Sequence, residues 1–105
     1  MIIKIRKSPV KHKRYRVYMD TGKHYDFGLD TGKTYINEGN KDKRYNYWKR
    51  HLANETELEL IYNLVPSPSL FSAYLLWGSS TDLKKNVETL NKLWLEKHEK
   101  NLSKL

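Results

Sequence analysis

The sequence predicts an α+β domain: a small antiparallel N-terminal sheet of two or three strands, followed by three or four short helices. Apolar residues alternate with polar ones up to about residue 28, which is typical of strands. From residue 41 onward they recur every three or four positions, which is typical of helices. A chain of 105 residues is expected to form one domain. Within it, residues 1–40 are expected to be strands and loops, 41–95 helices, and 96–105 a frayed charged tail.

Three N-terminal segments have the period of a strand. Residues 2–6 alternate weakly, and residues 14–19 alternate clearly, with Tyr15, Val17 and Met19 on one face. The residues Asp20-Thr21-Gly22-Lys23 are typical of a turn, and residues 24–28 alternate again, so we expect a hairpin. Within it, Phe27 is expected to be a core aromatic, and Gly28 to let the chain turn away from the sheet. Residues 30–40 hold two glycines and few apolar side chains, which predicts a loop.

The first helix is expected from Lys41, with the stripe Tyr45, Trp48 and Leu52 on its apolar face. Its Asp42 would complement the positive end of the helix dipole. Asn54 or Thr56 is expected to cap the second helix, which should end at the Pro-Ser-Pro-Ser run of residues 66–69.

Ser67 or Ser69 is expected to cap a third helix over residues 70–77, which Gly78 would end. Ser80 or Thr81 is expected to cap the last helix. Its apolar positions are spaced four, three and four residues apart, at Leu83, Val87, Leu90 and Trp94. We expect Trp77 and Trp94 to meet in the core.

The net charge of +8 lies in one half of the chain. Residues 1–55 hold 14 basic and 6 acidic side chains, whereas residues 56–105 hold 6 of each. Such a basic half is typical of proteins that bind phosphates or an acidic protein surface; the alternative is a solvated basic face, with Tyr45 and Trp48 in the core. Arg44 and Arg50 lie on different helix faces, so we expect one of them to pair internally with Asp26 or Asp42 while the other faces outward. The candidate interaction face consists of Lys4, Arg6, Lys7, Lys11, Lys13, Arg14, Arg16, Lys41, Lys43, Arg44, Lys49 and Arg50, with Tyr18 and Tyr47 as candidate stacking aromatics.

Several motifs resemble those of enzymes but lack residues or spacings that the corresponding catalytic or phosphate-binding sites require. The two Asp-Thr-Gly triplets at residues 20 and 30 are each followed by lysine, which argues for turns and against an aspartic protease. Residues 28–34 have three residues between their glycines where a phosphate-binding loop has four. The four histidines show no metal-ligand spacing, and cysteine is absent. We therefore expect no enzyme, no metal and no cofactor, and no apolar run is long enough to predict a membrane span.

The order of several motifs resembles a family. These motifs are Lys23-His24-Tyr25-Asp26-Phe27-Gly28, Lys41-Asp42-Lys43-Arg44-Tyr45, Lys49-Arg50-His51, Pro68-Ser69-Leu70 and Leu75-Leu76-Trp77. In this order they resemble the small basic, largely uncharacterised proteins of nucleocytoplasmic large DNA viruses. The chain departs from them at Tyr35-Ile36, where the family has Asp-Tyr-Thr, and at residues 54–57, where the family has Glu-Asn-Trp.

The resemblance implies a viral protein carried in the particle. The leading hypothesis is a non-enzymatic minor capsid protein that bridges larger capsid subunits, with the virion as its location and the host cytoplasm or viral factory during assembly. Its partners would be acidic or polar capsid surfaces. The alternative is a nucleic-acid-binding protein with little sequence preference that is packaged with viral DNA or acts on it.

Overall fold

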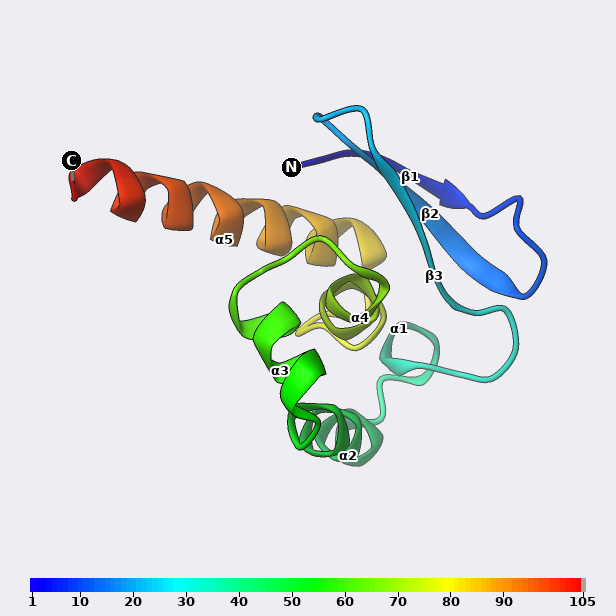
Figure 1. Cartoon of the computed structure of the whole chain (residues 1–105). Helices are drawn as coiled ribbons and strands as arrows, with labels where there is room; N and C mark the ends of the chain where they lie inside the picture. The colour runs from blue at the N-terminus through cyan, green and yellow to red at the C-terminus, as the bar shows by residue number, and fades with distance from the viewer. Residues whose placement is uncertain (105) are drawn as a thin grey trace.

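The computed structural model describes residues 1–104 and confirms the α+β class. Three strands form one antiparallel sheet in the order β1-β2-β3, and the helices lie to one side of it (Figure 1). The predicted Asp20–Lys23 turn connects the last two strands. The elements are β1 (Ile2–Lys7), β2 (Lys13–Met19), β3 (His24–Leu29), α1 (Tyr35–Glu38), α2 (Lys41–Leu52), α3 (Glu55–Tyr62), α4 (Pro68–Phe71), the π-helical turn η1 (Ser72–Leu76) and α5 (Leu83–Ser103).

The sheet has an inner face, which the helices cover, and an outer face. Val17 and Phe27 lie on the inner face and are fully buried. Gly28 has a φ of +77°, and a Cβ there would lie 2.8 Å from Leu76 Cδ1. A side chain at this position would therefore be strained by its backbone and would also push into η1.

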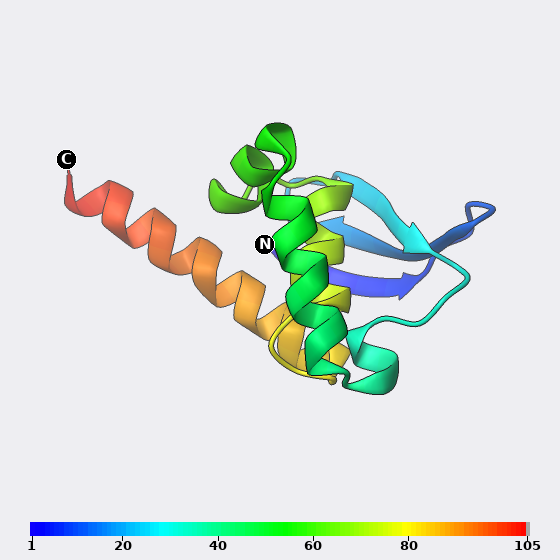
Figure 2. The same ribbon diagram turned by 90° about the horizontal axis from the view of Figure 1, so that it is seen from below.

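The helices pack in two layers behind the sheet. α4 and η1 run against β3 and α5, and on the side away from the sheet α3 covers α4 while α2 covers η1 (Figure 2). Phe71 is fully buried where these layers meet, with its ring centroid 5.5 Å from that of Tyr25 and 5.7 Å from that of Phe27. The main core is thus formed by the inner face of the sheet together with α4, η1 and Leu90 of α5.

Two of the predicted helix caps are confirmed. The side chains of Asn54 and Ser67 accept hydrogen bonds from the backbone N–H groups three residues later. The last helix is different, because its N-cap is Asp82, which accepts from Lys84 and Lys85. The prediction of Ser80 or Thr81 was wrong, since Ser80 instead accepts a hydrogen bond from the Asp82 N–H.

Two predicted boundaries need correction. Residues 35–38 of the predicted loop form the short helix α1, because Thr34 and Asn37 make a reciprocal capping box and Gly39 ends the turn with a φ of +66°. The predicted frayed tail is helical as far as Ser103. Lys97 donates to the Asn63 carbonyl at 2.5 Å and thereby anchors the start of this stretch. α5 is therefore not short, and residue 105 lies outside the described part of the chain.

Two asparagines of α5 tie distant segments to the core. Asn86 is 1% exposed, donates to the carbonyls of Leu75 and Ser80, and accepts from the Ser80 N–H. Asn91 accepts from the Ile2 N–H at 2.8 Å and donates to the Ile2 carbonyl at 2.9 Å. The side-chain amide of Asn91 therefore forms with the Ile2 backbone the same pair of hydrogen bonds that a backbone residue of a neighbouring antiparallel strand would form.

Both tryptophans pack against the main core, as expected, but their rings lie against different partners. Trp77 stacks on Tyr47 of α2, with ring centroids 4.6 Å apart and planes 8° apart. Trp94 packs against Phe71 and donates its indole N–H to the Leu64 carbonyl. Trp77 therefore joins the end of η1 to α2, and Trp94 joins α5 to α4 and to the loop after α3.

Across residues 1–104, no helix has the length and apolar character needed to span a membrane.

Candidate functional site

The outer face of the sheet carries one group of the predicted basic residues. The strand register places Lys4 opposite Tyr18, and Arg6 opposite Arg16. The Lys4 ammonium lies 5.9 Å and the Arg6 guanidinium 5.5 Å from the centre of the Tyr18 ring. Two cations therefore flank one half-exposed aromatic ring on the uncovered side of the sheet.

Arg16 on this face is engaged by a carboxylate. Its Nε and a terminal nitrogen donate to the two oxygens of Asp26 at 2.9 and 3.1 Å, and the Ser8 hydroxyl donates to Asp26 at 2.5 Å. Hydrogen bonding from Arg16, then from Ser8, holds the pKa of the Asp26 carboxyl below its usual value. This pair links β2 to β3 and fixes the Ser8 loop.

Asp26→Asn is expected to destabilise the protein at neutral pH and to have no effect in strong acid. A carboxyl whose pKa is lowered by folding contributes stability above its unfolded pKa of about 3.9, and this stability is lost as the pH falls through the folded value. Thermal unfolding of both proteins between about pH 7 and pH 2 measures the difference. A destabilisation that persists unchanged at the acidic end would show that packing, and not charge, is responsible.

Two further arginines act as internal ties. Arg14 donates to the carbonyl of Gly32 at 2.6 Å and to the side chain of Asn37 at 3.1 Å, and so fixes the loop before α1. Arg44 donates to the carbonyls of Trp77 and Gly78 at 3.0 and 2.8 Å. The internal partner foreseen for Arg44 or Arg50 is thus a pair of carbonyls and not Asp26 or Asp42.

The remaining members of the predicted face are exposed and dispersed. Lys7, Lys11 and Lys13 lie around the β1–β2 connection, and Lys41 and Lys49 lie on α2. Lys43 pairs with Glu38 at 3.1 Å. The structure therefore brings Lys4 and Arg6 together around Tyr18, but it does not collect the basic residues into one continuous surface.

Tyr47 is unsuited to stacking on a base. It is 9% exposed, one side of its ring is stacked on Trp77, and the His51 ring centroid lies 4.1 Å from its own. Burial, and then the charge of Glu57, raises the pKa of its hydroxyl far above the usual value. The buried side of α2 is formed by Arg44, Tyr47, Trp48 and His51. The expected stripe was therefore correct for Trp48 but wrong for Tyr45 and Leu52, which are 66% and 37% exposed.

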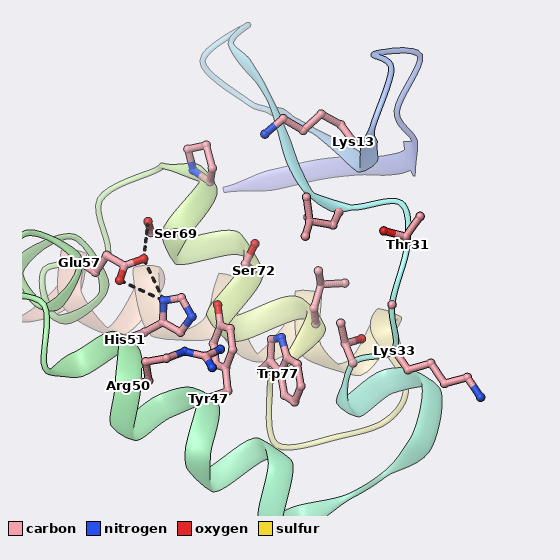
Figure 3. A pocket seen from close by; sticks show the side chains of 16 residues that line it. Lys13, Thr31, Lys33, Tyr47, Arg50, His51, Glu57, Ser69, Ser72 and Trp77 are labelled. Carbon is pink, nitrogen blue, oxygen red and sulfur yellow. Dashed lines mark hydrogen bonds and ion pairs between the residues drawn. The ribbon is translucent and has the colours of Figure 1, made fainter.

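A cleft that the sequence did not predict lies beside Tyr47. It has a volume of about 490 Å³ and lies between the loop after β3, the end of α2 and the start of α4. Lys13 of β2, Thr31 of the loop, and Arg50 and His51 of α2 line it (Figure 3). Ser72 lines it as well, from the first position of η1. The cleft therefore collects basic and hydroxyl groups from four separate segments.

His51 is held in a fixed orientation at the cleft. Its Nδ1 lies 2.9 and 3.0 Å from the two oxygens of Glu57, and Ser69 donates to the same carboxylate at 3.4 Å (Figure 3). Glu57 is the third residue of α3, where the helix dipole favours a negative charge. This arrangement places the proton on Nδ1 and leaves Nε2 for a ligand. No group of three metal-ligating side chains occurs among residues 1–104.

The comparisons with known proteins cover only part of the chain. No curated protein and no solved structure matches it. Residues 3–51, from β1 to His51 in the last turn of α2, are similar to a family of unknown function (DUF5754). The description of this family names no group of viruses.

Proposed function

We propose that this protein is a non-enzymatic component of the particle of a large DNA virus, a minor capsid protein that bridges larger capsid subunits through its basic residues. The viral setting is supported by the order of motifs described in the sequence. The bridging role is supported by charge: the basic residues that remain exposed face several directions, so one small domain can contact more than one acidic neighbour.

The observation that carries this proposal is that three arginines form hydrogen bonds within the protein and so are not free to contact a ligand. Arg14, Arg16 and Arg44 are bonded within the protein, and a continuous row of free guanidiniums, as expected for a groove that follows a phosphate backbone, is absent from residues 1–104. The exposed charge is carried mainly by separate lysines. Dispersed lysines suit contacts to acidic protein surfaces of a capsid, in the virion or during assembly in the host cytoplasm or viral factory.

The outer face of the sheet favours a second candidate, a nucleic-acid-binding protein with little sequence preference. Tyr18 lies between Lys4 and Arg6 on that face, and a ring flanked by cations can stack on a base while the cations contact phosphates. In that case affinity for a DNA oligonucleotide should fall about tenfold or more between 50 and 200 mM salt. A flat response to salt, or no binding at 50 mM, would exclude this candidate.

The capsid proposal predicts that the dispersed exposed lysines are needed for incorporation into particles. Lys11→Gln combined with Lys49→Gln is expected to reduce the copy number of the protein in purified particles about tenfold, as two lost interfacial charges would do. Quantitative mass spectrometry of the particles measures this. The control, Lys85→Gln combined with Lys92→Gln, removes the same charge from exposed positions of α5 and should leave the copy number unchanged. Particles that lack even the unaltered protein would refute the proposal.

A further inference from the structure

β1 forms one edge of the sheet, and an apolar groove lies between this strand and the first turns of α5 (Figure 2). We propose that the edge binds an extended segment of an acidic partner protein, which adds a fourth strand beside β1. In such a segment, acidic residues alternate with apolar ones. This binding site does not depend on the particle proposal, because it is defined by the strand edge and not by where the partner is found.

The backbone of β1 carries hydrogen-bonding groups that point away from β2. The Ser8 N–H, directly after β1, donates to the Arg14 carbonyl of β2 at 3.1 Å. Because successive residues of an antiparallel strand point their N–H and C=O groups to opposite sides, those of Lys7 and Ile5 point to the edge. Within residues 1–104, no hydrogen bond reaches them from beyond this edge. An unpaired row of this kind is a template for an added strand.

Asn91 of α5 already takes the place of a neighbouring strand at one position of the edge. Its side-chain amide bonds to the Ile2 N–H and to the Ile2 carbonyl, both of which point away from β2. The same service is missing at Ile5 and Lys7, further along the strand. A segment that continues along the edge from Asn91 would therefore pair with a backbone that is ordered in advance, and an ordered site loses less entropy on binding.

The groove beside the edge favours apolar side chains at every second position of the segment. It has a volume of about 460 Å³. Its lining includes Ile3, Lys4, Ile5, Leu83, Lys84 and Val87. Ile3 is 70% exposed, although it is apolar. Because the side chains of a strand alternate between its two faces, every second side chain of the added strand would enter this groove.

The charges beside the edge favour acidic side chains at the other positions. Lys4 and Arg6 lie on the outer face of β1, on either side of the Tyr18 ring. Among residues 1–104, neither forms an ion pair with a carboxylate, and the groove has no acidic residue in its lining. The outward side chains of an added strand would stand next to these two cations, and opposite charges on neighbouring strands attract each other.

A second copy of this chain fits the same edge poorly. In an antiparallel pair of β1 strands centred on Ile5, Lys4 of one copy would lie opposite Arg6 of the other. Like charges directly opposite one another destabilise a strand pair, and lysines on edge strands commonly prevent such self-pairing. An acidic segment turns the same two residues from a repulsive contact into an attractive one.

The test is amide hydrogen exchange of the full chain, followed by NMR with and without a synthetic peptide. In the peptide, glutamate alternates with valine over about six residues, the usual length of a strand. At saturation the Ile5 and Lys7 amides should exchange about tenfold more slowly or less, because each gains a partner. The Arg6 amide points to β2 and is the internal control. No saturable binding up to about 1 mM peptide, or no slowing at Ile5 and Lys7, would overturn the proposal.

Two modified peptides separate strand addition from simple charge attraction. In an antiparallel fourth strand, the residue opposite Ile5 points its side chain to the groove and its N–H to β1. N-methylation of the valines should therefore abolish binding, whereas N-methylation of the glutamates should leave it intact. The reverse result would support a parallel fourth strand at the same edge. Equal effects of both modifications would contradict strand addition.

Lys4→Gln combined with Arg6→Gln tests the preference for acidic residues. The Kd for the peptide, measured by fluorescence anisotropy, should rise about tenfold. Both side chains are exposed, so the variant is expected to fold. The control, Lys33→Gln combined with Lys41→Gln, removes the same charge from the loop after β3 and from α2 and should leave the Kd unchanged. An equal rise in both variants would reduce the binding to general attraction by a basic protein and would overturn the site.

Other occupants of the edge are detected by the same exchange measurement. If the chain dimerises on its own and thereby slows the Ile5 and Lys7 amides, the edge belongs to a second copy. If a DNA oligonucleotide slows them, it belongs to a nucleic acid. Either result would overturn the proposal of an acidic segment. None of these outcomes would affect the particle measurement above, which uses lysines elsewhere on the chain.

Discussion

Phe71→Ala is expected to lower the free energy of unfolding by about 3–5 kcal/mol. Phe71 is fully buried, and its ring lies between those of Tyr25, Phe27 and Trp94 at centroid distances of 5.5 to 6.2 Å. Removing it opens a cavity where the sheet, α4 and α5 meet, and three rings lose a packing partner at once. Since a domain of this size is typically stable by about 5–15 kcal/mol, a large share of the stability would be lost.

Urea unfolding followed by tryptophan fluorescence and by circular dichroism measures the effect of Phe71→Ala. Leu95→Ala serves as the control, because Leu95 lies on α5 and is 49% exposed, so a loss below about 1 kcal/mol is expected. A loss for Phe71→Ala as small as that of the control would mean that the sheet and the helices do not pack together through this ring.

Asn86→Leu is expected to cost about 3 kcal/mol, although leucine has the same branched arrangement of side-chain heavy atoms and is more apolar. Asn86 is 1% exposed and bonds to the backbone of Leu75 and Ser80 at three points, between 2.8 and 3.1 Å. Leucine would leave two carbonyls and one N–H without these partners. Removing partners from buried polar groups costs more than the added apolar burial returns.

The matched control for Asn86→Leu is Asn46→Leu, at an exposed position of α2. Chemical denaturation should show a change within about 0.5 kcal/mol for the control and the full loss for Asn86→Leu. If Asn86→Leu were as stable as the unaltered protein, the loop between η1 and α5 would not depend on this side chain for its conformation.

The strands and most helix positions are predictable from the sequence because each rests on a local signal. The alternation of Tyr15, Val17 and Met19 identifies the inner face of β2, and Val17 and Met19 are indeed buried. Asn54 and Ser67 cap helices as their residue types predict. Asp82 was missed because three successive residues, from Ser80 to Asp82, are all suitable caps. Only the tertiary position of Ser80, fixed by Asn86, decides among them.

The buried side of α2 could not be predicted from apolar spacing. Arg44, Tyr47, Trp48 and His51 follow the helical period, but two of the four are polar. Their burial depends on partners far away in the sequence, namely the Trp77 and Gly78 carbonyls for Arg44 and Glu57 for His51. An apolar pattern therefore selects Tyr45 and Leu52, which lie on the exposed side.

The cleft was missed for a related reason. Arg50 was predicted as a basic contact residue, and His51 was considered without a carboxylate partner. Glu57 lies six residues later on another helix, so no regular spacing connects it to His51. The signal that was available is the position of Glu57 three residues after Asn54, in the first turn of a helix, where acidic side chains are favoured by the helix dipole.

The bonds between Asn91 and Ile2 join residues 89 positions apart in the sequence. During synthesis β1 leaves the ribosome first, yet the asparagine that bonds to its Ile2 backbone emerges only when most of the chain has been made. The β2–β3 hairpin can form early because its contacts are local. β1 cannot reach its final bonding until α5 has been translated. The bonding of Ile2, at the start of β1, is therefore completed only by the last helix, and a ribosome that stalls before residue 91 would hold a chain in which this backbone lacks its two partners.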